Sequence, residues 1–171
     1  TMCLLKLLLI LSLVTSNVFA VNAPDKYWFI QSINTPVNLT VQNDKKEIII
    51  AIVDDGFNTT HEALNRFIWN NPGEIPDNNV DDDGNGFIDD INGWDISDND
   101  NQLKPHPSRL MRFYHGTHLA GIITRILSTG LGENAADHFK ILPVKAISDN
   151  ASHEYLKEGY QGIDYAIRMG A

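Results

Sequence analysis

The clearest hydrophobic pattern in the sequence is a continuous apolar run that ends in a polar turn. Residues Glu47 to Val53 read Glu, Ile, Ile, Ile, Ala, Ile, Val, and Asp54, Asp55 and Gly56 follow. β-Branched residues without polar alternation are typical of a strand that is buried on both faces, as in parallel sheets. The run therefore predicts a buried parallel strand that ends at a turn.

A helical period appears further along the chain. Between Gly116 and Leu127 the apolar residues recur at spacings of three and four: Leu119, Ile122, Ile123, Ile126 and Leu127. This spacing gives one apolar stripe and predicts an amphipathic helix. His115 would lie at the N-terminal end of that helix.

The last part of the chain repeats the alternation of strand and helix. Phe139 to Ile147 has strand character. A final helix, which Ser152 could cap, is predicted from the spacing of Leu156, Tyr160, Ile163 and Ile167. The order strand, helix, strand, helix predicts an α/β fold with a mainly parallel sheet, because parallel neighbours need a crossover and helices cover the sheet faces.

Two segments lack a regular period. Residues 21–43 contain Pro24, Pro36 and a group of aromatic residues, which predicts an extended arm that packs its aromatic side chains onto the body. Asn70 to Pro107 is rich in Asn, Asp, Gly and Pro, and this composition predicts a long structured loop. Loops of that length are usually functional.

The first twenty residues have the three zones of a signal peptide. Lys6 precedes the apolar run Leu7 to Val14, and Val18, Phe19 and Ala20 follow as a cleavage site. The apolar run is shorter than the roughly 20 residues that cross a bilayer. We therefore expect cleavage after Ala20 and a secreted or extracytoplasmic mature chain, residues 21–171, without a membrane anchor.

The net charge argues against nucleic acid as a partner, and the cysteine content argues against disulfides and thiol catalysis. The chain carries a formal net charge of −9 at pH 7, and removal of Lys6 with the signal peptide makes it −10. Such an acidic chain is unsuited to binding nucleic acid phosphates. The single cysteine, Cys3, lies inside the signal peptide, so the mature part has neither a disulfide nor a catalytic thiol.

The candidate chemistry lies where predicted elements end and begin. Asp54 ends a buried strand and His115 begins a helix, and ligands of α/β sheets bind outside the carboxyl ends of the strands. The positive end of the helix dipole favours a neutral imidazole, which can accept a proton. A carboxylate facing the other ring nitrogen would fix the tautomer and stabilise the imidazolium. The two residues thus predict a general base and its orienting carboxylate.

Both sets of residues also have simpler interpretations. Asp54 and Asp55, taken alone, are typical of a turn after a strand. His115 and His118 are three residues apart and share a helix face, as the two histidines of a metal pair would, although no third ligand at a zinc spacing stands out.

The motifs themselves resemble a known family. Ile52, Val53, Asp54, Asp55, Gly56 and then His115, Gly116, Thr117, His118, Leu119, Ala120, Gly121 are similar to the first two signature motifs of the subtilisin-like serine proteases. Trp69 to Glu74 and Asp82 to Trp94 resemble a loop of many bacterial members. The resemblance covers roughly Tyr27 to Ala171.

This resemblance implies a fold, an activity and roles for residues. The fold would be a three-layer subtilisin-like α/β fold, and the activity that of a serine endopeptidase acting on polypeptides. Asp54 would be the triad aspartate, His115 the general base, and His118 a structural residue. Asp55 departs from the Ser or Thr of many members, and a second carboxylate could perturb the titration of Asp54.

The third member of such a triad is not in the sequence. The family's Gly, Thr, Ser motif does not occur before Ala171, and the serines at 128, 148 and 152 stand in other contexts. We therefore expect a truncated catalytic domain that cannot carry out acyl transfer alone. The alternative is a secreted calcium-binding or interaction module that keeps the protease fold without catalysis.

The acidic loop contains a pattern that resembles a calcium site. Oxygen ligands fall at positions one, three, five and nine of a calcium-loop spacing: Asp81, Asp83, Asn85 and Asp89. Gly86 falls where such a loop turns sharply, but Asn92 replaces the closing Glu at position twelve. The pattern predicts a structural calcium ion, and a solvated acidic turn is the alternative.

Overall fold

The computed structural model describes residues 28–36, 40, 47–107, 115–150 and 158–171, in two compact units, Thr1–Asn34 and Thr35–Ala171. In the first unit, Trp28–Ser32 forms the short helix α1. The expected extended arm is therefore wrong for these residues, because local bonds such as Ser32 Oγ to the Trp28 carbonyl (3.0 Å) satisfy the backbone. The Trp28 side chain is 62% exposed.

The second unit is built on a parallel sheet. Strands β1 (Ile48–Asp54), β2 (Trp94–Asp95) and β3 (Phe139–Lys145) are arranged in the order β1-β3-β2, and both pairs are parallel. The register runs from Ile48 opposite Phe139 to Asp54 opposite Lys145. Both predicted long strands are confirmed. Most of the predicted loop is irregular, but two of its residues form β2 because they pair with the end of β3.

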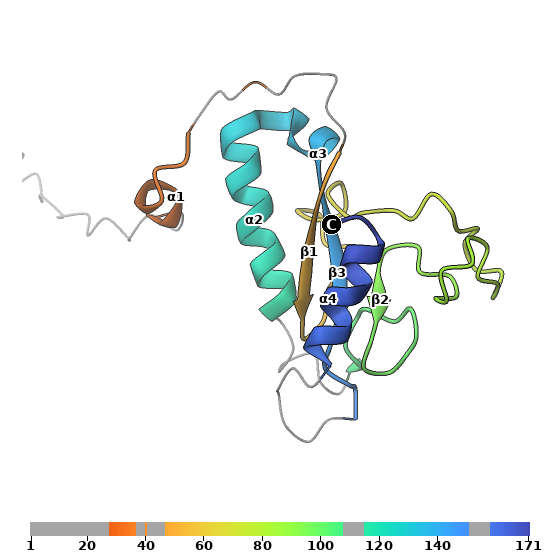
Figure 1. The fold of residues 1–171 in the computed structure, drawn as a ribbon. Coiled ribbons are helices and arrows are strands. Elements are labelled where there is room, and N and C mark those ends of the chain that lie inside the picture. The colour runs from red at the N-terminus through yellow and green to blue at the C-terminus, as the bar shows by residue number, and fades with distance from the viewer. Residues whose placement is uncertain (1–27, 37–39, 41–46, 108–114, 151–157) are drawn as a thin grey trace, which may run out of the picture. The chain divides into compact units, whose positions relative to one another are not determined.

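Helices cover both faces of the sheet (Figure 1). Helix α2 (His115–Leu131) is followed by the 3₁₀ helix η2 (Gly132–Asn134) and by α3 (Ala135–His138). One face of β1, with Ile50 and Ile52, packs into the core formed with α2 and α3, and the other, with Ala51 and Val53, into the core formed with α4 (Gly159–Arg168). The predicted α/β fold with helices on both faces is confirmed.

Helix α4 turns a different face to the sheet than its apolar spacing predicts. The buried residues are Gly162, Tyr165 and Ala166, whereas Tyr160 is 90%, Ile163 50% and Ile167 65% exposed. Small residues let the helix approach the strands, and the Tyr165 ring packs edge-on against Phe87. The predicted cap Ser152 and Leu156 lie outside the described residues. No described helix is both long enough and apolar enough to span a membrane.

Candidate active site

The end of β1 and the start of α2 bring Asp54 and His115 into direct contact. Asp54 Oδ2 lies 2.7 Å from His115 Nδ1. The other carboxylate oxygen, Oδ1, accepts the backbone N–H of Asp55 at 2.7 Å, so the carboxylate is held in one orientation. The Asp54 side chain is 12% exposed and the imidazole 71%, which leaves the ring open to solvent. The expected meeting of these two residues at the carboxyl edge of the sheet is confirmed.

Gly116 and Thr117, at the start of α2, pack against the turn that follows β1. A Cβ on Gly116 would lie 2.6 Å from the Gly56 carbonyl oxygen, so only glycine allows this approach. The hydroxyl of Thr117 accepts the backbone N–H of Asn58 at 3.0 Å. The histidine motif therefore consists of one side chain available for chemistry and two residues that fix its distance from β1.

The electrostatics of His115 differ from the expectation based on the helix dipole. The hydrogen bond and negative charge of Asp54 raise the pKa of His115 above its usual 6.5, although burial opposes this and the charge of Asp55 adds to it. Asp55 also accepts the first N–H groups of α2, at 3.1 Å from His115 N and 2.9 Å from Gly116 N. The helix dipole was expected to favour the neutral ring, whereas the neighbouring carboxylates shift the pKa of His115 in the opposite direction. Burial, which outweighs these hydrogen bonds, raises the pKa of Asp55.

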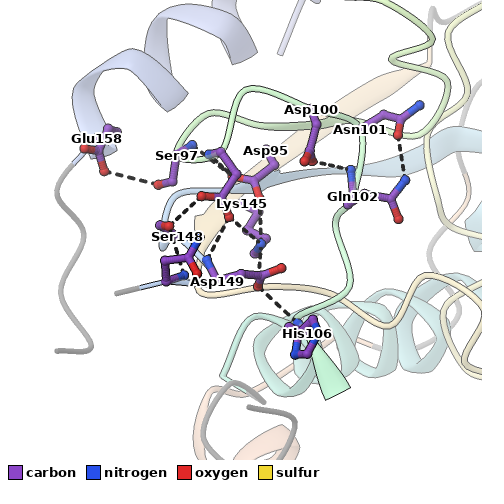
Figure 2. A network of polar contacts seen from close by, with 12 residues as sticks. Asp95, Ser97, Asp100, Asn101, Gln102, His106, Lys145, Ser148, Asp149 and Glu158 are labelled. Atoms are coloured by element: carbon purple, nitrogen blue, oxygen red, sulfur yellow. Dashed lines mark hydrogen bonds and ion pairs between the residues drawn. The ribbon is translucent and has the colours of Figure 1, made fainter. Parts of the chain in front are cut away.

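A buried lysine organises the same edge of the sheet (Figure 2). Lys145 stands opposite Asp54 in the β1–β3 register, and its side chain is 0% exposed. Its Nζ lies 2.6 Å from Asp95 Oδ2, 2.9 Å from Asp149 Oδ1 and 3.5 Å from Asp98 Oδ2. Burial alone would lower the pKa of Lys145, but Asp95 and Asp149 raise it, so the ammonium is charged at neutral pH.

The carboxylates around Lys145 connect the segment that follows β2 with the segment that follows β3. Asp95 ends β2, and its Oδ1 accepts the backbone N–H groups of Ser97 and Asp98. Asp149 follows β3 and accepts the backbone N–H of His106 at 3.1 Å. One charged side chain therefore holds together the segments that follow β2 and β3 (Figure 2).

The acidic loop forms a second polar cluster. Glu74, Asp83 and Asp90 each offer a carboxylate oxygen, and these three oxygens lie within 4.8 Å of one another. Asn71 Nδ2 bridges two of them, at 3.0 Å from Asp83 Oδ2 and 2.7 Å from Asp90 Oδ1. Burial, followed by the charge of Asp83, raises the pKa of Asp90 against the hydrogen bonds that it accepts from Asn71, Tyr165 and Asn85.

The structure brings only part of the predicted calcium set to this cluster. Asp83 belongs to it, and Asn85 Nδ2 reaches Asp90 Oδ2 at 3.2 Å. Asp81 instead accepts the backbone N–H groups of Asn85 and Gly86. Asp89 accepts those of Asn78 and Asn79, at 3.3 and 2.9 Å. The expected sharp turn at Gly86 is present, with φ +97.

Several residues at these sites were not predicted. Glu74 and Asp90 lie outside the one-three-five-nine spacing, and Lys145 is part of an apolar strand in the sequence. A lysine within a buried run is itself a signal, because it needs buried acidic partners. His118 is exposed, and the described part of the chain offers no third ligand for a metal pair with His115.

Comparisons with known proteins identify the family to which the sequence is similar. A model of a family described as the Subtilase family matches residues 45–171. Subtilisin-like protease 1 of Plasmodium vivax is 33% identical over 124 residues, which cover 71% of this chain and 19% of that protein. Subtilisin-like protease 1 of Plasmodium falciparum isolate 3D7 is 28% identical over 163 residues, or 86% of this chain and 22% of that protein. The chain thus spans about a fifth of the length of these curated relatives.

Proposed function

Because this chain belongs to the subtilase family, we propose that the full-length protein is a secreted serine endopeptidase that hydrolyses polypeptides with an Asp/His/Ser triad. Asp54 and His115 would supply two members of the triad, and the serine would come from a part of the protein outside this sequence. The observation that carries the proposal is the 2.7 Å contact between Asp54 Oδ2 and His115 Nδ1 beside an exposed ring.

The contact supports a specific division of labour. With Nδ1–H donated to Asp54, the neutral ring presents Nε2 as a proton acceptor on its exposed side. Nε2 would take the serine proton as the oxygen attacks the peptide carbonyl, and would then give that proton to the leaving amine. Asp54 would hold the tautomer and stabilise the imidazolium formed between the two transfers.

The raised pKa of His115 gives the test of this function. A fluorophosphonate probe should label the full-length protein at one serine, and only the neutral ring can act as base. Since the pKa of His115 lies above 6.5, the labelling rate should be low in acid and rise with pH through an apparent pKa above 6.5. No labelling, or a rate that does not change between about pH 5 and 9, would contradict the proposal.

We also propose that the acidic loop binds a structural calcium ion. Calcium takes carboxylate and carbonyl oxygens at about 2.3–2.6 Å, so two oxygens on one ion are at most about 5 Å apart. The oxygens of Glu74, Asp83 and Asp90, within 4.8 Å of one another, fit that limit. A bound cation would offset the mutual repulsion of the three carboxylates, and Asn85 could contribute its amide oxygen after rotation.

The calcium proposal predicts a loss of stability in chelator. Removing an ion present at about 100 times its Kd should lower the free energy of unfolding by about 2.7 kcal/mol. The melting temperature of the full-length protein should therefore fall in EDTA. In Asp83→Asn the fall in melting temperature on adding EDTA should be much smaller. Asp77→Asn changes an exposed residue of the same loop and should show the same fall as the wild type. Equal melting temperatures with and without chelator would rule out a stabilising ion.

A further inference from the structure

Asp55 is joined to the candidate catalytic histidine through the backbone. Its two carboxylate oxygens accept separate N–H groups, Oδ2 from His115 at 3.1 Å and Oδ1 from Gly116 at 2.9 Å. Asp55 is only 6% exposed. The bonds therefore lie in a buried setting, where a charge-assisted hydrogen bond is strong.

These two hydrogen bonds cap the N-terminal end of α2, a role usually filled by a residue just before the helix. The first N–H groups of a helix have no partner within the helix, and a side chain just before it usually accepts one of them. Here the acceptor is the residue that directly follows β1, sixty residues before His115. Both oxygens of one carboxylate thus tie the helix end to the strand end.

The adjacent residue completes the arrangement. Asp54 holds the His115 ring at Nδ1, and Asp55 holds the His115 backbone at N. The backbone N–H of Asp55 in turn donates to Asp54 Oδ1 at 2.7 Å, so the Asp54 carboxylate is held by the backbone of the next residue. The ring and the backbone N–H of His115 are therefore both held by the residues Asp54 and Asp55.

We propose that Asp55 is a positioning residue that sets the geometry of the Asp54–His115 pair by holding the N-terminal end of α2 against the end of β1. The proposal rests on the catalytic role proposed for His115. It assigns Asp55 a task different from perturbing Asp54, because its oxygens face the helix backbone and its own N–H is what meets the Asp54 carboxylate.

The test replaces Asp55 in the full-length protein. Asp55→Asn keeps the size of the side chain but leaves one acceptor oxygen and no charge, so one helix N–H loses its partner. We expect kcat to fall by up to about 100-fold with a much smaller change in KM, since a small displacement of a reacting group has effects of that size. Asp55→Ala, which removes both acceptors, should lower kcat further.

A second readout follows the His115 ring directly. The hydrogen bond and charge of Asp54 are the largest causes of the raised pKa of His115, so loosening of the Asp54–His115 contact in Asp55→Asn should lower that pKa, and loss of the Asp55 charge adds to the fall. The pKa is measured by NMR on the ring signal that is missing from His115→Ala. Asp137→Asn removes an exposed carboxylate on α3 and should leave the titration unchanged. Ile141→Val, in the core of β3, serves as a control for a modest loss of stability.

Two outcomes would overturn the positioning role. One is a His115 titration in Asp55→Asn that coincides with that of the wild type. The other is a fall in kcat no larger than that of Ile141→Val. Because the titration needs no catalysis, it decides the role of Asp55 even if the wild-type protein proves not to hydrolyse peptides, a result that would count against the proposed function instead.

Discussion

Replacing His115 with Ala in the full-length protein should lower kcat for peptide hydrolysis by on the order of 10⁶-fold and abolish fluorophosphonate labelling. In the proposed mechanism His115 accepts the serine proton, and Ala has no atom that can do so. The Asp54 carboxylate is held by the Asp55 N–H and cannot replace the exposed ring. The magnitude is the one measured in subtilisin, a member of this family.

Two variants sharpen that experiment. Asp54→Asn keeps the shape of the site but disturbs the ring tautomer, and should cost about 10⁴-fold in kcat, the loss known for this replacement in a Ser/His/Asp triad. His118→Ala removes an exposed histidine from the same helix and should leave kcat nearly unchanged. Undiminished labelling of His115→Ala would refute the general-base role, and equal losses in both histidine variants would point to damage to α2 instead.

Replacing Lys145 with Met should have the largest effect on folding, a loss of about 3–5 kcal/mol in the free energy of unfolding. The side chains of Lys145 and Asp95 are both 0% exposed, and Met leaves the Asp95 charge buried without its partner. Asp149 and Asp98 would then add repulsion. The loss is measured as a shift of the denaturant midpoint in the full-length protein.

Matched variants separate the charge from the shape of the lysine. Lys140→Met makes the same change on the same strand, where Nζ reaches the Arg66 carbonyl in an exposed bond, and should cost less than about 1 kcal/mol. Adding Asp95→Asn to Lys145→Met should restore part of the loss, since the amide oxygen can still accept the N–H groups of Ser97 and Asp98. A Lys145→Met protein as stable as Lys140→Met would show that the buried pair contributes nothing.

β1 and α2 could be predicted because the faces that each one buries carry large apolar side chains. β1 is covered on both faces and shows an unbroken apolar run, and α2 is covered on one face and shows a stripe. Helix α4 could not be predicted in this way. Its contact face uses Gly162 and Ala166, which carry little hydrophobic signal, so the larger apolar residues on its exposed side dominated the pattern.

The candidate site was predictable only in part, for a similar reason. Asp54 and His115 stand at element ends within specific motifs, so the sequence places them together. The contacts of Asp55, Glu74, Asp90 and Lys145 are made by oxygens and nitrogens whose direction depends on the backbone. Asp89, for example, fits the calcium spacing in the sequence. In the structure its backbone has φ +55, and its carboxylate accepts the N–H groups of residues 78 and 79 instead of joining the acidic cluster.

The parallel pairing of β1 with β3 has a consequence for synthesis of the protein. Ile48 pairs with Phe139, which follows it by 91 residues (139 minus 48). At roughly 5–20 residues per second, ribosomes make β3 about 5–20 s after β1. During that interval the Ile-rich strand has no sheet partner, and long-range pairing of this kind forms slowly. The nascent chain therefore exposes a hydrophobic, aggregation-prone strand until β3 has been made.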